Sequence, residues 1–239
     1  MGAPVVSAIL GPTPEPLRLF LIRHGETEWS SSGRHTGLTD VPLIARGEAD
    51  ARELGKALRS VPFGHVFSSP LQRARRTCEL VGLGPPAQLE PDLEEWDYGD
   101  YEGRRTSDIR LRDEHWNLYR DGCPQGETPE QAVLRADRLF VRLGALVGNV
   151  ALFTHGEISG VLAARWVGLS VVHAEHFQLR TASLGVLGYA VHHPDVPVID
   201  QWNGTSDASV RRSEPKGGTG RREEGKTSAN PFVAMRGSE

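Results

Sequence analysis

Two short apolar runs in this chain end abruptly in a histidine. The run 17–22 leads through Arg23 into His24, and the run 150–154 leads into His155. Nearly continuous apolar segments of this length are typical of strands buried on both faces of a parallel sheet. Because open α/β sheets bind ligands at the carboxyl ends of their strands, the two histidines are candidates for one site. The arginine beside the first histidine indicates an anionic ligand, and phosphate is the leading candidate.

The rest of the chain alternates between strand-like and helix-like patterns. The expected strands are 17–22, 65–67, 150–153, 184–190 and 196–201. The expected helices follow Gly47, begin with Ser69 as N-cap and Pro70 as first helical residue, run from Thr128 to about Val147, and cover 158–167. Residues 30–39, rich in Gly, Ser and Thr, indicate a loop. This alternation predicts an α/β fold: a three-layer α/β/α sandwich with a mostly parallel central sheet.

The length and composition favour one large domain with extensions. With 239 residues and 38% hydrophobic content, the chain can bury a substantial core. We assign 1–16 to an N-terminal extension, 17–202 to the folded domain, and 93–123 to an insertion over the active site. Residues 203–239 are too polar to offset their ordering entropy, and we expect them to form a disordered tail.

Charge and cysteine content exclude several classes of protein. The formal net charge of -4 gives no reason to expect a nucleic-acid partner. No segment has the length and apolarity of a membrane span, so we expect no membrane partner. The two cysteines are too few for a disulfide framework and lack the spacing of metal ligands. A cytoplasmic location is the simplest interpretation, while the oligomeric state is not predicted.

Three arginines lie in the opening turns of the helix expected after residue 69. Arg73, Arg75 and Arg76 place positive charge where the helix dipole disfavours it, at a cost of about 0.3–1 kcal/mol each. An anion bound at the helix N-terminus would compensate for that cost. Arg73 lies nearest the N-terminus and is the candidate for direct contact, whereas Arg75 and Arg76 are expected to be solvated or paired on the surface.

The residues around His24 suit phosphoryl transfer. Histidine can attack phosphorus when one ring nitrogen is free and the other holds a proton fixed by a hydrogen bond. Gly25 would let the backbone approach a phosphate closely. Glu95 stands among aromatic residues, where an apolar setting raises the pKa of a carboxyl group and suits it to act as a general acid. Taken singly, each feature has an ordinary alternative: a surface dipeptide, a solvated acid, or a core histidine for His155.

Several motifs, occurring in order, resemble those of one known family. They are Leu21 to Thr27 (LIRHGET), Gly37 to Leu43 (GLTDVPL), Ser69 to Ala74 (SPLQRA), Glu95 to Gly103, and Thr154-His155-Gly156. Together they resemble the histidine phosphatase superfamily, whose fold is called phosphoglycerate-mutase-like, over about 17–193. The resemblance implies an enzyme that hydrolyses phosphomonoesters and requires no metal and no organic cofactor.

The resemblance also implies roles for individual residues. His24 would be the nucleophile that becomes phosphohistidine, and Glu95 would donate a proton to the leaving oxygen. Arg23, Arg73 and His155 would form the phosphate pocket. The remaining substrate-binding candidates are Ser30, Thr36, Gly37, Tyr98 and Gly156. The expected partner is a small phosphorylated molecule.

Finer features resemble a narrower group, which contains fungal sedoheptulose-1,7-bisphosphatases and bacterial broad-specificity acid phosphatases. Ser30 stands where the commoner family pattern has asparagine, and the chain lacks a clear equivalent of the insertions that cofactor-dependent mutases carry. Phosphatase is therefore favoured, with sedoheptulose 1,7-bisphosphate as the leading specific substrate. A mutase-type phosphotransferase, a phosphoprotein phosphatase and a non-catalytic phosphate-binding scaffold stay open as alternatives.

One departure bears on that substrate. Where close relatives carry histidine and, three residues on, arginine, this chain has Glu157 and Gly160. If that arginine grips a second phosphate, its loss weakens bisphosphate recognition, and Glu157 could repel an anion. Compensating cations could come from Arg104, Arg105 or Arg120. Aromatic residues of the insertion could face a sugar or simply pack; they are Trp96, Tyr98, Trp116 and Tyr119.

Overall fold

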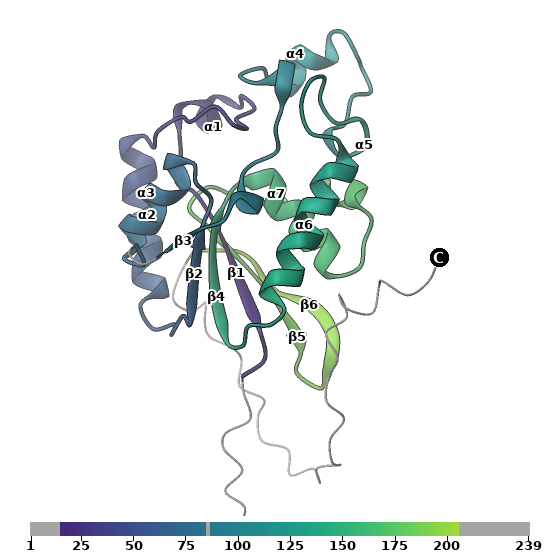
Figure 1. Ribbon diagram of the computed structural model, residues 1–239. Helices are drawn as coiled ribbons and strands as arrows, with labels where there is room; N and C mark the ends of the chain where they lie inside the picture. The colour runs from purple at the N-terminus through teal and green to yellow at the C-terminus, as the bar shows by residue number, and fades with distance from the viewer. Residues whose placement is uncertain (1–14, 85–86, 206–239) are drawn as a thin grey trace, which may run out of the picture.

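A computed structural model describes residues 15–84 and 87–205, and its centre is a six-stranded sheet (Figure 1). The strands are β1 (Arg18–Arg23), β2 (His65–Ser68), β3 (Gln88–Leu89), β4 (Asn149–Thr154), β5 (Leu184–Ala190) and β6 (His193–Gly204). Their order across the sheet is β3-β2-β4-β1-β5-β6, in which the first four are parallel and β5 and β6 are antiparallel. The predicted α/β fold with a mostly parallel sheet is confirmed.

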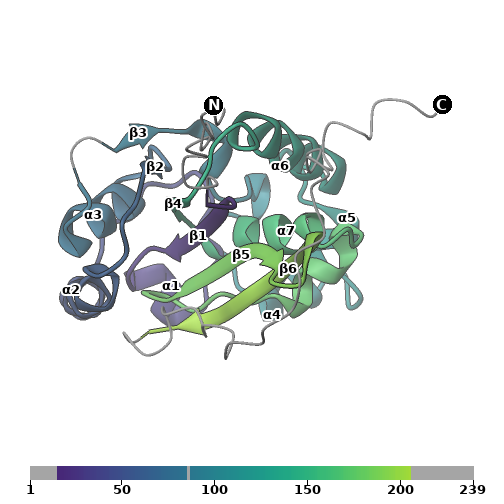
Figure 2. The same cartoon turned by 90° about the horizontal axis from the view of Figure 1, so that it is seen from below.

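Helices cover both faces of this sheet, and further short helices lie at one end. The α-helices are α1 (Glu28–Ser32), α2 (Ala45–Leu58), α3 (Gln72–Val81), α4 (Thr106–Arg110), α5 (Leu118–Asp121), α6 (Pro129–Leu143) and α7 (Gly156–Trp166). The 3-10 helices are η1 (Pro91–Leu93), η2 (Gly99–Tyr101) and η3 (Val171–His176). Seen from below, α2 and α3 lie on one side of the sheet and α6 and α7 on the other (Figure 2).

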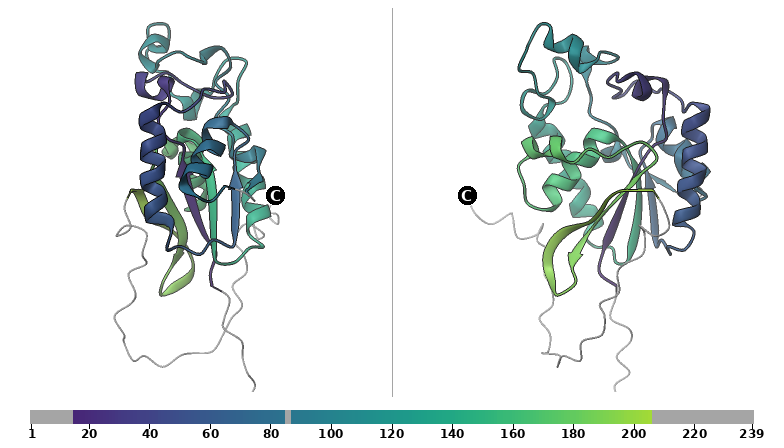
Figure 3. Two further views of the ribbon diagram at one scale, coloured as in Figure 1. Left: turned by 90° about the vertical axis from the view of Figure 1, so that its left-hand side faces the viewer. Right: turned by 180° about the vertical axis from the view of Figure 1, so that it is seen from behind.

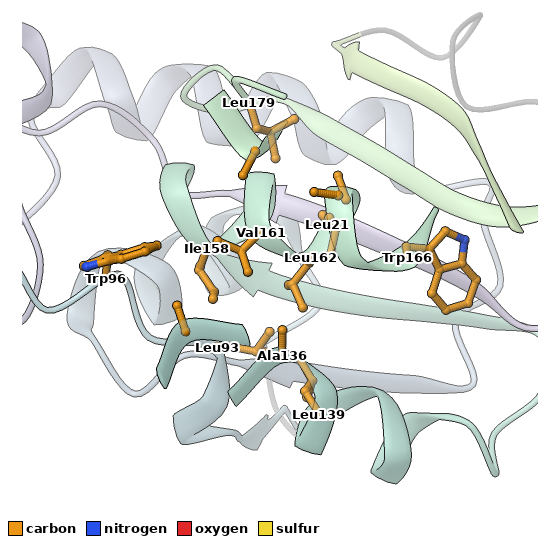
Figure 4. Close-up of a cluster of buried hydrophobic side chains, with 14 of the residues drawn as sticks. Leu21, Leu93, Trp96, Ala136, Leu139, Ile158, Val161, Leu162, Trp166 and Leu179 are labelled. Carbon is orange, nitrogen blue, oxygen red and sulfur yellow. The ribbon is translucent and has the colours of Figure 1, made fainter. Parts of the chain in front are cut away.

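The alternation of side chains along β1 connects the sheet to both helical layers. Phe20 and Ile22 belong to the core beneath α2 and α3, whereas Leu19 and Leu21 belong to the core beneath α6 and α7. Figure 4 shows part of the second core, where Leu21 lies near Leu162. Both alternating sets of side chains in such a strand are buried, so polar residues are tolerated only at its ends. The polar residues therefore begin where β1 stops.

The carboxyl ends of the parallel strands are covered by irregular chain. The short helices α1 and α4 lie at this end of the molecule in each side view (Figure 3). Residues 93–123, the predicted insertion, include η2, α4 and α5 and contribute to this cover. The site expected at the strand ends is therefore covered by the insertion and by short helices.

Several predicted boundaries were wrong. Helix α3 has Leu71 as its N-cap and begins at Gln72, two residues after the predicted first helical residue, Pro70. Helix α6 begins with the predicted capping box of Thr128 and Gln131, but it ends at Leu143 and Gly144 is its C-cap. The loop expected over 30–39 begins with the last residues of α1, which Thr27 caps.

The sheet also extends beyond its predicted limits. The short edge strand β3 was not predicted, because its two residues are exposed and carry no alternating pattern. Strand β6 continues to Gly204, so the first residues assigned to the tail belong to the sheet. Asn203 accepts a hydrogen bond from the backbone N–H of Arg180 and donates one to the carbonyl of Gln178. The rest of that predicted tail, 206–239, and residues 1–14 of the predicted extension lie outside the described residues.

Within residues 15–84 and 87–205, every helix is too short or too polar to cross a lipid bilayer.

Candidate active site

The two histidines meet because β1 and β4 are neighbours in register. Arg23 pairs with Thr154 at the ends of these parallel strands, and the next residue on each strand is a histidine. The backbone N–H of His24 donates to the Thr154 carbonyl at 3.1 Å. The imidazole rings of His24 and His155 lie with their centroids 5.1 Å apart. The position predicted for these residues is confirmed.

The surroundings of His24 fix its tautomer. Its Nδ1 lies 2.7 Å from the carbonyl oxygen of Gly25, which can only accept, so Nδ1 carries the proton. Burial, together with the charges of Arg73 and Arg23, lowers the pKa of His24 well below its usual value. The ring is therefore neutral, and the lone pair of Nε2 is available for attack on an electrophile.

Arg73 organises the loop that follows α1. Its side chain is fully buried, and its guanidinium donates to the backbone carbonyls of Thr36, Gly37 and Thr39 at 2.7–3.2 Å. Three carbonyls on one guanidinium hold the loop firmly against the end of the sheet. The unfavourable charge at the start of α3 is thus explained by these fixed partners. Arg76 pairs with Glu48 and Glu79 on the surface, as predicted.

Arg73 also sets the tautomer of His155. Its Nε donates to Nδ1 of His155 at 3.1 Å, so Nδ1 must accept and Nε2 carries the proton. That proton points to the hydroxyl of Ser69, 2.8 Å away, which also accepts the backbone N–H of Leu71 at 3.3 Å. Burial and the charge of Arg73 lower the pKa of His155 well below its usual value, and the ring is neutral.

Arg23 carries an unsatisfied donor. Its Nη1 donates to the carbonyl of Leu179 at 2.6 Å, but its buried Nε has no hydrogen-bond partner among the described residues. A buried guanidinium N–H without a partner is costly. The first turn of α7 packs closely on this group, because a Cβ at Gly156 would lie 2.9 Å from Cζ of Arg23. An anionic ligand beside His24 would give the orphaned donor its partner.

Glu95 lies at the N-terminus of α7. Its Oε1 accepts the backbone N–H groups of Trp96 and Ile158, and its Oε2 accepts that of Glu157, at 2.9–3.0 Å. Burial, and then the neighbouring Glu157 carboxylate, raise the pKa of Glu95 above its usual value despite these three bonds. Oε2 has the fewer partners and is the oxygen better placed to hold a proton.

These groups surround a small cavity of about 180 Å³. It is lined by Arg23, His24, Ser30, Gly33, Arg34, His35, Thr36, Glu95, Tyr98 and Glu157. Five predicted residues besides His24 thus face it: Arg23, Ser30, Thr36, Glu95 and Tyr98. Sequence reasoning missed Gly33, Arg34 and His35 as lining residues. His35 stacks on Tyr98 with ring centroids 4.5 Å apart, and burial lowers its pKa to about 4, so it too is neutral.

Four predicted substrate-binding residues lie behind the cavity wall. Arg73 and His155 are fully buried and contact the site through the loop carbonyls, Ser69 and the His24 ring. Gly37 is packed so tightly that a Cβ would come 2.3 Å from the carbonyl oxygen of Trp96. Gly156 is pressed against Arg23 in the same way. These residues support the lining in this structure and do not form it.

The structural reason for a glycine at position 25 differs from the one predicted. A Cβ at Gly25 would lie 2.3 Å from the carbonyl oxygen of Gly47, so this glycine permits close approach to the start of α2. Its N–H donates to the Thr77 hydroxyl at 3.0 Å. The close approach that glycine allows here is therefore between two backbone segments.

The aromatic residues of the insertion divide into lining and core. Tyr98 faces the cavity, and Tyr119 lies one layer behind it and donates a hydrogen bond to the carboxylate of Glu157. Trp96 and Trp116 are buried, and their indole N–H groups donate to the carbonyls of Glu127 and Gly122. Trp116 packs as expected, while the sugar-facing role considered for Trp96 is excluded by its burial.

The space near Gly160 is closed. A Cβ at this position would lie 2.9 Å from the carbonyl oxygen of Ala174 in η3 and 3.2 Å from that of Phe177. The backbone of η3 and its following turn therefore leaves no room for a side chain here. Arg104, Arg105 and Arg120, the suggested compensating cations, are not among the residues lining the cavity, and Arg120 pairs with Asp121 on the surface.

Among the described residues, no group of three or more His, Cys, Asp or Glu side chains is arranged to hold a metal ion.

Known proteins of similar sequence include phosphatases and probable phosphoglycerate mutases. Residues 19–205 match the family described as the histidine phosphatase superfamily (branch 1). The chain is 33% identical over 248 residues to the sedoheptulose 1,7-bisphosphatase of Saccharomyces cerevisiae, an alignment covering 77% of this chain and 91% of that relative. It is 39% identical over 176 residues to an acid phosphatase of Mycobacterium tuberculosis, covering 72% of this chain and 86% of that one.

Solved structures agree with these matches. The product of an open reading frame of Mycobacterium tuberculosis superposes with a TM-score of 0.74 at 35% identity, covering 79% of this chain and 97% of that chain. The alpha-ribazole phosphatase of Shigella flexneri superposes with a TM-score of 0.69 at 29% identity, covering 79% and 97%. The chain therefore belongs to the histidine phosphatase superfamily, as its motifs predicted, and it is a phosphatase enzyme.

Proposed function

We propose that this phosphatase hydrolyses a small phosphomonoester, a sugar phosphate above all, through a phosphohistidine formed on His24 and without a metal ion. The observation that carries the proposal is the tautomer of His24. The Gly25 carbonyl holds the proton on Nδ1, so the neutral ring directs the lone pair of Nε2 to incoming phosphorus. A nucleophile with this arrangement needs no general base.

In the first step, Nε2 of His24 attacks phosphorus and the bond from phosphorus to the ester oxygen breaks. The leaving oxygen takes the proton of the Glu95 carboxyl group, whose raised pKa keeps it available near neutral pH. The orphaned Nε of Arg23 donates to a phosphoryl oxygen, and the buried charge of Arg73 adds to the field that favours the phosphoryl group.

In the second step, water attacks the phosphorus of the phosphohistidine. Glu95, now a carboxylate, accepts a proton from that water, and the bond between phosphorus and Nε2 breaks to release inorganic phosphate. Arg73 and Ser69 hold His155 in one tautomer beside His24 throughout the cycle. We assign His155 the role of positioning the reacting ring and the phosphoryl group.

The yeast relative is named for sedoheptulose 1,7-bisphosphate, and this sugar bisphosphate is the leading specific substrate by similarity. A mutase would instead return the phosphoryl group from His24 to a second hydroxyl of a bound phosphate ester. A non-catalytic scaffold would retain phosphate binding without turnover. The cytoplasmic location expected from the sequence stays part of this proposal.

The test is rapid-quench turnover of p-nitrophenyl phosphate and of sugar phosphates in the presence of EDTA. We expect hydrolysis with an acid-labile phosphoenzyme, and His24→Ala should lose both signals, with kcat falling about 10⁴-fold or more. The matched control is His193→Ala, which alters an exposed histidine on the β5–β6 hairpin. Wild-type activity in His24→Ala, or activity abolished by EDTA, would refute the mechanism. Phosphate transfer without release would identify a mutase.

A further inference from the structure

One part of the cavity wall is formed by Glu157. This residue belongs to the first turn of α7, and its carboxylate accepts a hydrogen bond from Tyr119 of α5. Tyr119 is itself buried and packs edge-on against Trp96, with ring centroids 5.7 Å apart. Burial and the Glu157 charge raise the pKa of Tyr119 well above its usual value, so the phenol stays protonated and continues to donate. The Glu157 carboxylate is thus held in place at the cavity.

The charges that face the cavity are unevenly distributed. Arg23 and Glu95 stand beside His24, where the reacting phosphate is handled. The other charged groups in the lining are Glu157 and Arg34, while His35 is neutral. Arg34 is exposed to solvent, where its field is screened, whereas Glu157 is partly buried and fixed by Tyr119. A second anion on the substrate would therefore meet the Glu157 carboxylate.

Space beyond Glu157 offers no alternative anchor for an anion. One turn along α7, a Cβ at Gly160 would lie 2.9 Å from the carbonyl oxygen of Ala174 and 3.2 Å from that of Phe177, so this position has no room for a cationic side chain. On this part of the cavity wall the Glu157 carboxylate accepts hydrogen bonds and supplies none. A cavity of about 180 Å³ also falls below the usual size of a site for drug-sized ligands, about 300–1,000 Å³.

We infer that Glu157 is a specificity-determining residue, and that the enzyme takes phosphate monoesters whose alcohol part donates hydrogen bonds and carries no second anionic group. Small polyol phosphates are the class that fits. This inference rests on the proposed function, since it assumes that the reacting phosphate lies beside His24. The inference favours substrates with a single phosphate group over the sugar bisphosphate that similarity alone suggests.

The experiment compares two substrates of nearly equal size, glycerol 3-phosphate and 3-phosphoglycerate, which differ in a hydroxymethyl or a carboxylate at the far end. Wild-type enzyme should have the higher kcat/KM for glycerol 3-phosphate. Glu157→Gln should shrink that preference about tenfold or more, mainly by improving 3-phosphoglycerate, because a like charge has been removed. Glu53→Gln makes the same change on the exposed face of α2 and should leave the preference unchanged.

Two further variants keep the inference falsifiable. Tyr119→Phe keeps the Glu157 charge but removes the hydrogen bond that holds its carboxylate in place. This variant should shrink the preference for glycerol 3-phosphate by a smaller factor. It tests the inference even if Glu157→Gln does not fold. Arg34→Ala should leave the preference for glycerol 3-phosphate intact. A preference unchanged in both Glu157→Gln and Tyr119→Phe, a wild-type preference for 3-phosphoglycerate, or a loss of 3-phosphoglycerate activity in Arg34→Ala would overturn it. p-Nitrophenyl phosphate is the reference: if His24→Ala still hydrolyses it, the proposed function has failed instead.

Discussion

The two halves of the site are built in different ways. The histidine half stands on β1 and β4, whose register brings His24 beside His155, and its charged groups are arginines. The carboxylate half comes from the segment after η1 and the first turn of α7, and its charged groups are Glu95 and Glu157. The first half depends on the sheet, whereas the second depends on packing between the insertion and one helix end.

In the proposed mechanism, this difference separates the groups around the reacting phosphate from the groups that act on the leaving group. In the proposed mechanism, β1 ends in the phosphate ligand Arg23 and leads into the nucleophile His24, and movement there would be opposed by cores packed on both faces of the sheet. The carboxylate half would contact the leaving group in that mechanism, and its shape depends on a few contacts such as that between Tyr119 and Glu157. Changes in the histidine half should therefore lower activity on every substrate, while the effect of changes in the carboxylate half should depend on the leaving group.

The strongest test of this contrast is Arg73→Lys. Lysine cannot reach His155 and three loop carbonyls at once, so buried acceptors lose their donors. We expect kcat to fall about 10²- to 10³-fold and the free energy of unfolding to fall by about 2–4 kcal/mol. Steady-state kinetics and urea denaturation measure both. Arg75→Lys, on the exposed side of the same helix, is the control, and an Arg73→Lys enzyme with normal kcat and stability would contradict the role of Arg73.

An intermediate effect is expected from Glu95→Gln, and its size should depend on the leaving group. An alkyl phosphate needs the proton of Glu95, so its turnover should fall about 10²-fold or more. p-Nitrophenolate leaves without a proton, so this variant should release one equivalent of it in a burst and then stall at phosphohistidine. Stopped-flow absorbance detects the burst. Glu94→Gln alters the adjacent carboxyl group as a control, and equal loss on both substrates without a burst would argue against Glu95 as the proton donor.

The smallest effect concerns pH. Glu95 must be protonated to act as an acid, and the Glu157 charge contributes to raising its pKa. Removing that charge in Glu157→Gln lowers the pKa, so Glu95 loses its proton at lower pH. The alkaline limb of kcat/KM for glycerol 3-phosphate should therefore move to lower pH, with Glu53→Gln showing the wild-type profile. An alkaline limb that stays at the same pH or moves to higher pH would mean that the two carboxylates do not interact.

The sequence predicts the histidine half because its evidence is local. An apolar run followed by a histidine identifies a strand and a position at its end, and two such runs indicate neighbouring positions in one sheet. Arg73 is predicted for the same reason, since an arginine in a first helical turn needs a partner. Its actual partners, loop carbonyls and His155, depend on tertiary packing that no short pattern records.

The carboxylate half is only partly predictable. Glu95 is found through its motif, but Arg34 and His35 come to the cavity because an irregular loop folds over the strand ends. Ser69 carries a strong N-cap signature, yet its hydroxyl partners His155, which lies 86 residues further along the chain. The local signature places the helix start two residues early, because Ser69 accepts the N–H of Leu71 in the turn before α3 and contacts His155 as well.

The packing at Gly160 limits how this enzyme can be redesigned. An engineer who wished to install a cationic side chain at this position, to favour substrates with two phosphates, would meet the Ala174 carbonyl at 2.9 Å from the first added atom. A single substitution would therefore distort η3 before it gained any affinity. The change becomes accessible only after the segment that contains η3 has been shortened or rebuilt, so the new specificity requires loop remodelling first and a point mutation second.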